Sequence, residues 1–178
     1  SSSRVTVFDV ASITDGENAV NVLGQSSWNS ATRTASQSGM NLPAGLSFEA
    51  ANARLYVGDN VNNRVLIYDV ASITDGENAI NVLGQSNFTS ATSGTTQSTM
   101  NSPYYVNHDG GTRLFVGDRG NHRVLVFDTT SITDGENAVN VLGQPTFTST
   151  GAATTQGRFS SPYMIDLEAG TSRLYVSE

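Results

Sequence analysis

The chain has 178 residues and a formal net charge of −7, with 16 acidic residues, 9 basic residues that are all arginine, and no cysteine. The acidic excess argues against nucleic-acid binding, which depends on clustered basic side chains, and the lack of cysteine excludes disulfides and thiolate metal sites. No apolar run approaches the roughly 18 residues that indicate a membrane span.

A segment of about 59 residues occurs three times along the chain. Its arginine-led motif (RVTVFD, RVLIYD, RVLVFD) begins at Arg4, Arg64 and Arg123. The block SITDGENA and the motif VLGQ recur with the same spacing. Self-similarity at a fixed period is typical of solenoids, propellers and other repeat arrays.

The first half of the chain contains one incomplete and one complete repeat. Residues 1–25 are the outer half of a repeat, a Ser/Thr-rich loop follows (26–42), and residues 43–85 form a complete repeat. In that repeat we predict four strands, at 44–50, 54–59, 64–69 and 80–85. These lengths are usual for strands, and four short strands per repeat favour a propeller blade.

The second half of the chain repeats this order. A second loop (86–102) leads to another complete repeat in residues 103–144, and a third loop (145–161) leads to the inner half of a repeat in residues 162–178. The sequence therefore predicts two whole blades and two half blades.

The turn motif carries a resemblance to a known family. GNHRVLVFD (120–128) and the longer run RLFVGDRGNHRVLVFD (113–128) resemble the NHL repeat, and VLGQPTFTS (141–149) is similar to the outer-strand extension of a bacterial branch with longer blades. Asn63 and Ser3 stand where His122 does, so the histidine is not required in every blade. The resemblance implies an all-β, NHL-like β-propeller, commonly six-bladed, that is used for binding and has a few enzymatic relatives.

The incomplete repeats predict self-association. A second copy placed after the first would continue the 59-residue spacing, and residues 172–177 of one copy would pair with residues 4–9 of the other. Unpaired strand edges recruit such partners. Since propellers usually have 4–8 blades, we expect a blade split between the termini to be completed in a six-bladed dimer or a head-to-tail filament. A segment of a longer NHL-repeat protein is the alternative.

An acidic residue and an arginine flank the turn between the second and third strands of every repeat. A catalytic group is needed once, whereas a contact that holds a turn is needed in each repeat, so we interpret these residues as a structural latch. The pairs are Asp59 with Arg64, Asp118 with Arg123, and Glu178 with Arg4.

Two other recurring features have structural interpretations. The ITDGEN block places two carboxylates around a glycine, as in Asp15 and Glu17, which is too few oxygens for calcium; a tight turn stabilised by glycine and Asp side chains explains it better. The aromatic residue after each VLGQ motif, at Trp28, Phe88 and Phe147, is interpreted as a plug between blades.

Candidate binding residues are those at which the repeats differ. Residues of the innermost strand line the channel of a propeller or its mouth, and variation there is not dictated by the fold. The candidates are Tyr104, Tyr105, Asn107, His108, Tyr163 and Asp166.

No set of nucleophile, base and orienting group stands out from the repeat, so we expect a non-enzymatic structural or interaction protein without metal or cofactor. Its expected partner is a second copy of itself; other proteins or glycans are further candidates, and nucleic acid is not expected. A ligand- or protein-binding propeller that uses the channel mouth is the alternative function. Richness in Ser, Thr, Asn and Gly favours a secreted or cell-surface protein. The resemblance to a bacterial branch of the NHL family implies a bacterial or archaeal source.

Overall fold

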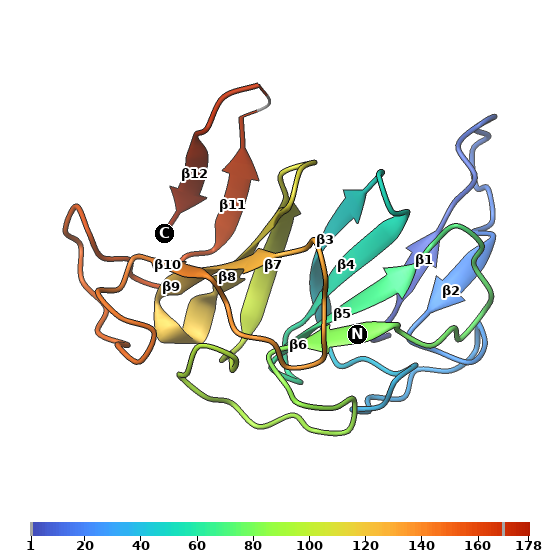
Figure 1. Cartoon of the computed structure of the whole chain (residues 1–178). Helices are drawn as coiled ribbons and strands as arrows, with labels where there is room; N and C mark the ends of the chain where they lie inside the picture. The colour runs from blue at the N-terminus through green and yellow to red at the C-terminus, as the bar shows by residue number, and fades with distance from the viewer. Residues whose placement is uncertain (1, 169) are drawn as a thin grey trace.

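The computed structural model describes residues 2–168 and 170–178, which form four antiparallel sheets in chain order. Figure 1 shows these sheets side by side, and the first strands of the last three sheets contact one another in order. The expected all-β class is confirmed, and each complete repeat forms one four-stranded antiparallel sheet.

The two outer sheets have two strands each. The first pairs β1 (Val5–Val7) with β2 (Asn21–Leu23), and the last pairs β11 (Met164–Leu167) with β12 (Leu174–Ser177). The two four-stranded sheets between them keep chain order: β3 (Pro43–Glu49), β4 (Arg54–Asp59), β5 (Arg64–Asp69) and β6 (Asn81–Leu83), then β7 (Pro103–His108), β8 (Arg113–Asp118), β9 (Arg123–Asp128) and β10 (Asn140–Leu142). A short 3-10 turn, η1 (Arg119–Asn121), joins β8 to β9.

The fourth strand of the repeat is shorter than its predicted range of 80–85. It ends at Leu83 because Gly84 adopts a φ of 87°, which a strand does not tolerate. A Cβ at Gly84 would lie 2.9 Å from the backbone oxygen of Asn63. The glycine therefore turns the chain inward and delivers Gln85 to a buried position, where its side chain donates to Asn63 O (3.0 Å) and Thr92 O (2.9 Å).

The middle strands are apolar on both faces because both faces are covered. In β4 and β5, Tyr56 and Ile67 pack toward the following sheet, whereas Val57 and Leu66 pack toward the preceding one. A third apolar cluster joins Phe115 and neighbouring residues of the second four-stranded sheet to β11 and β12. Each sheet is thus stabilised by its neighbours, as in other repeat proteins.

The first strands of the two four-stranded sheets approach each other backbone to backbone. Both strands have a register shift, between Pro43 and Leu46 in β3 and at the equivalent place in β7. A Cβ on Gly45, inside this shift, would lie 2.6 Å from Tyr105 Cα and 2.7 Å from the nitrogen of Val106. Only a residue without a side chain fits there.

We predict that Gly45→Ala destabilises the protein by about 1–3 kcal/mol, the usual cost of overpacking, because the neighbouring atoms are backbone and cannot rotate away. The measurement is urea-induced unfolding followed by tryptophan fluorescence. Gly157→Ala is the matched control, since a Cβ there would meet nothing within 4 Å. Equal midpoints for the two variants would contradict the close approach of β3 and β7.

Candidate functional site

A fully buried ion pair closes the turn between β4 and β5. Arg64 Nε donates to Asp59 Oδ2 at 2.7 Å, and both side chains are shielded from solvent. The other guanidinium nitrogens donate to backbone carbonyls of two loops: Ser36 (3.0 Å) and Gly39 (2.9 Å) in the preceding loop, and Phe88 in the following one. One arginine thereby holds a turn and two loops together.

The carboxylate of Asp59 has three donors. Besides Arg64, Asn62 Nδ2 donates to Oδ2 (2.8 Å) and the backbone nitrogen of Asn41 donates to Oδ1 (2.7 Å). Burial raises the pKa of Asp59, and the charge of Arg64 together with the hydrogen bonds of Asn41 and Asn62 opposes that rise. A buried charge is tolerated only when it is paired and hydrogen-bonded in this way.

The second complete repeat contains the same arrangement. Arg123 Nε donates to Asp118 Oδ2 at 2.6 Å, and its other nitrogens donate to the carbonyls of Thr96 (3.0 Å), Thr99 (2.8 Å) and Phe147. Both side chains of the pair are again buried. The structure therefore brings together both pairs that the sequence proposed as latches within single repeats.

The two residues of the third proposed pair, Arg4 and Glu178, lie apart, and each forms a hydrogen bond with a loop near it. Arg4 Nη1 donates to Trp28 O at 2.7 Å, which corresponds to the bond from Arg64 to Phe88 O. Glu178 Oε2 accepts from the nitrogen of Ser160 at 2.7 Å, which corresponds to the bond from Asn41 to Asp59. Arg4 and Glu178 thus each occupy half of a latch site at opposite sides of the array of sheets.

The position that His122 occupies has the same role in all three repeats, although its side chain differs among them. Ser3, Asn63 and His122 all adopt positive φ, and each accepts a hydrogen bond from a backbone nitrogen 39 residues later along the chain. The distances are 3.3 Å from Leu42 to Ser3 Oγ, 2.8 Å from Ser102 to Asn63 Oδ1, and 2.9 Å from Ser161 to His122 Nδ1. Any short side chain with an acceptor serves this purpose.

The DGEN turns make a contact that the sequence did not predict. Each glycine of the block has positive φ, and Glu77 Oε2 accepts from the nitrogen of Thr74 at 2.9 Å, so a tight turn is present. In addition, Asp75 Oδ1 accepts from the nitrogen of Val22 at 3.0 Å, in the sheet that precedes its own. This second role of Asp75 becomes visible only when the structure places its turn next to β2.

Three of the proposed binding residues form one aromatic cluster. The rings of Tyr104 and Tyr163 lie 4.8 Å apart, Tyr105 lies within 6.3 Å of both, and the guanidinium of Arg119 lies over the first two rings at 5.9 and 5.8 Å. Further along the same strands, Asn107 Nδ2 donates to Asp166 Oδ1 at 3.3 Å. The structure therefore places five of the six candidates on adjoining stretches of β7 and β11 or next to them.

The sixth candidate, His108, points into the seam between the two four-stranded sheets. Its ring stacks on Tyr56 with centroids 5.4 Å apart, and its Nδ1 accepts from the nitrogen of Gly110 at 3.1 Å. The proton is therefore on Nε2, which lies 3.0 Å from Thr129 Oγ1. Burial lowers the pKa of His108, which favours the neutral ring.

Glu49 completes this buried polar group. Its Oε2 accepts from Tyr56 Oη at 2.6 Å and lies 3.8 Å from His108 Nε2, while Asn52 donates to Oε1. Burial raises the pKa of Glu49, but the hydrogen bonds from Tyr56 and Asn52 together with the charges of His108 and Arg54 outweigh this effect, so the pKa lies below its ordinary value. The group cross-links the two sheets and has little contact with solvent.

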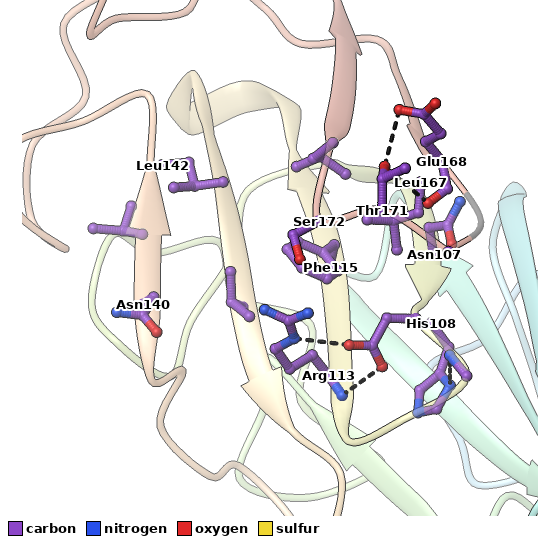
Figure 2. Close-up of a pocket in the computed structure, with 16 residues that line it drawn as sticks. Asn107, His108, Arg113, Phe115, Asn140, Leu142, Leu167, Glu168, Thr171 and Ser172 are labelled. Atoms are coloured by element: carbon purple, nitrogen blue, oxygen red, sulfur yellow. Dashed lines mark hydrogen bonds and ion pairs between the residues drawn. The ribbon is translucent and has the colours of Figure 1, made fainter.

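A groove of about 650 Å³ lies between the second four-stranded sheet and the β11–β12 pair. Figure 2 shows Phe115 and Leu142 on one side of it and Leu167 and Thr171 on the other. Leu174 of β12 also lines it.

Comparison with models of protein families finds no match, and a search of curated proteins finds none either. Across residues 2–168 and 170–178, a search for a helix long and apolar enough to cross a membrane finds none. In the same described part of the chain, no three His, Asp or Glu side chains are grouped so that they could bind a metal ion.

We predict that Arg64→Ala lowers the free energy of unfolding by about 3–5 kcal/mol, because removing one partner leaves the buried Asp59 charge unpaired. Denaturant unfolding measures the change. Arg33→Ala is the control: Arg33 is exposed in the 26–42 loop, and surface substitutions usually change stability by less than about 0.5 kcal/mol. A loss below about 1 kcal/mol for Arg64→Ala would show that the latch is not needed for stability.

Proposed function

We propose that this chain forms blades of an NHL-like β-propeller and associates head to tail with a second copy. In the proposed assembly, β11 and β12 of one copy and β1 and β2 of the other make one blade. The divided latch carries the proposal: Arg4 and Glu178 hold the loop contacts of the two buried pairs, and among the described residues neither meets the opposite charge that its counterparts have.

The strand edges fit the same assembly. Among the described residues, β1 pairs with β2 alone and β12 with β11 alone, whereas the equivalent strands β4 and β5 pair with each other along their whole length, from Arg54–Asp69 to Asp59–Arg64. Free edges expose backbone donors and acceptors that another strand can satisfy. A β12–β1 pairing in the β4–β5 register would bring Glu178 next to Arg4.

Side chains of the first sheet support the proposal because their exposure differs from that of their counterparts. Phe8 is 51% exposed, while Tyr68 and Phe127 at the same position of the repeat are fully buried. In contrast, Ile80 is 45% exposed, and its counterparts Val20 and Val139 are each 51% exposed. Exposure of Phe8 thus reflects a missing neighbour rather than a generally exposed position.

The groove described above matches Phe8. In the complete repeat Phe127 stands opposite Leu114 in the β8–β9 pair, so the same register would place Phe8 of a second copy opposite Leu174, which lines the groove. Burying one phenylalanine stabilises an interface by roughly 1.5–3 kcal/mol. The proposed contact therefore combines strand pairing, an ion pair and an apolar side chain in one place.

A six-bladed ring of two copies and an open head-to-tail filament use this same contact, and they differ only in whether the rotation closes. The function we propose is therefore structural: a self-associating, non-enzymatic module whose exposed surface consists of Ser/Thr-rich loops.

Ligand binding at the channel mouth is a second candidate, favoured by one observation. Tyr104, Tyr105 and Tyr163 cluster beneath Arg119, and Tyr163 remains nearly half exposed. Aromatic side chains with a polar tip are frequent in binding sites. Tyr163→Ala would abolish binding of such a ligand without affecting self-association.

We predict that the purified chain sediments as a dimer or larger species and that Phe8→Asp converts it to a folded monomer, because the variant loses the apolar contact with Leu174 and would have to desolvate a carboxylate at the proposed strand pairing. Analytical ultracentrifugation measures the mass, and electron microscopy distinguishes rings from fibres. Circular dichroism verifies that the variant remains folded.

Ile80→Asp is the matched control and should leave the sedimentation profile unchanged, since its position is exposed in every repeat. A wild-type chain that remains a folded monomer at micromolar concentration would refute self-association. That outcome would instead favour completion of the blade by a further repeat of a longer chain.

A further inference from the structure

The acidic turn of each complete repeat reaches back onto the sheet before it. Asp75 Oδ1 accepts from the nitrogen of Val22 (3.0 Å) and from Asn21 Nδ2 (3.4 Å), both in β2. The nitrogen of the next residue, Gly76, donates to Val22 O at 3.0 Å. The carboxylate of Asp75 and the backbone amide of Gly76 therefore bind the N–H and the C=O of one residue, Val22, in the preceding sheet.

The same grip occurs between the two four-stranded sheets. Asp134 Oδ1 accepts from the nitrogen of Val82 (3.0 Å) and from Asn81 Nδ2 (3.2 Å), and Gly135 N donates to Val82 O at 2.9 Å. We call this set of bonds, from the DGEN turn to the fourth strand of the preceding sheet, the clasp. Its repetition with nearly identical distances makes it a regular part of the seam.

A glutamine extends each clasp. Gln37 Nε2 donates to Ala79 O (2.9 Å) while Ala79 N donates to Gln37 O (2.9 Å), and Gln97 makes the same two bonds with Ala138 (2.7 and 2.9 Å). Both alanines are buried as a result. The clasp and the glutamine together fix the acidic turn at two points.

Within residues 2–168 and 170–178, the two halves of a further clasp are present but do not contact each other. The turn of the first sheet supplies Asp15, Gly16 and Ala19, and β10 with its following loop supplies Asn140, Val141 and Gln156, at the positions that the repeat spacing requires. Their exposure fits this: Val141 is partly exposed whereas Val22 and Val82 are fully buried. Figure 1 places β1 and β2 on the far side of the array from β10.

We propose that the acidic turn of one copy clasps β10 of a second copy. Asp15 accepts from the nitrogen of Val141 and the side-chain amide of Asn140, and Gly16 donates to Val141 O; the backbone of Ala19 exchanges two hydrogen bonds with Gln156. This inference rests on the proposed self-association and identifies the residues that set its direction.

The clasp consists of directional hydrogen bonds, whereas the proposed contact of Phe8 with Leu174 in the groove is apolar. An apolar contact contributes affinity but does not define orientation, and hydrogen bonds with fixed geometry do. Because the acidic turn and β10 are different surfaces, the contact is heterologous, as head-to-tail association requires. Asp15 is therefore an interface residue rather than only part of a turn.

Cysteine pairs test the clasp directly because the chain has no cysteine of its own. Asp15→Cys and Asn140→Cys are made in separate chains, mixed in equal amounts and oxidised with diamide. We expect a disulfide-linked dimer on a non-reducing gel from the mixture and not from either variant alone. The control is one chain with Asn21→Cys and Asp75→Cys, which should close an intramolecular disulfide at an existing clasp.

Asp15→Ala and Asp15→Asn give a second measure by sedimentation. Loss of the acceptor in Asp15→Ala should weaken association at least tenfold, whereas Asp15→Asn retains an acceptor oxygen and should restore most of it. If wild type assembles but the mixture does not cross-link although the control does, or if Asp15→Ala assembles as tightly as wild type, the clasp is refuted and self-association stands. If wild type does not assemble at all, both proposals fail together.

Discussion

The buried arginine of each complete repeat is the interaction on which the remaining structure depends. Arg64 places four of its N–H groups on one carboxylate and three carbonyls, which belong to the hairpin turn, the preceding loop and the following loop. Lysine could not replace it, because a single ammonium cannot reach acceptors arranged around a plane. The long Ser/Thr-rich loops, which lack strands of their own, are ordered around this guanidinium and around Gln85.

This arrangement makes each repeat incomplete on its own. The arginine draws on the loop before its sheet and the loop after it, the acidic turn holds the preceding sheet, and the apolar clusters lie between sheets rather than within them. Stability in such an array is a sum of neighbour contacts. A repeat at the edge of the described array therefore leaves several kinds of contact open at once, and in the proposed assembly a second copy would satisfy all of them.

Sequence reasoning found the strands, the two latch pairs within single repeats and the aromatic residues that pack between sheets, but not the polar contacts between sheets. The periodic runs RLYVGD and RVLIYD determine β4 and β5 almost residue for residue, because apolar runs bounded by turns allow little else. The clasp of Asp75 could not be predicted, since its partner Val22 lies 53 residues away and has no polar side chain to mark it. His108 points inward because its ring stacks on Tyr56 of another sheet. The sequence does not show this stacking, so it predicted a binding role for His108 as it did for the tyrosines.

The side-chain contacts between neighbouring sheets are not identical in every seam. This difference helps to explain why two copies would associate head to tail in a single order. Between the four-stranded sheets, His108 stacks on Tyr56 above Glu49. The β11–β12 pair contains the equivalent tyrosine and carboxylate, since Tyr175 Oη donates to Glu168 Oε2 at 3.1 Å. In the proposed assembly, the residue that takes the place of His108 over Tyr175 is Phe48 of the second copy, and Phe48 is 59% exposed in the single chain. An aromatic ring meets a tyrosine in both seams, but only the seam within the chain has the imidazole near the buried carboxylate. In the proposed assembly the seam between copies would therefore share the latch and the clasp with the seams inside the chain and differ from the seam between the four-stranded sheets by this one imidazole.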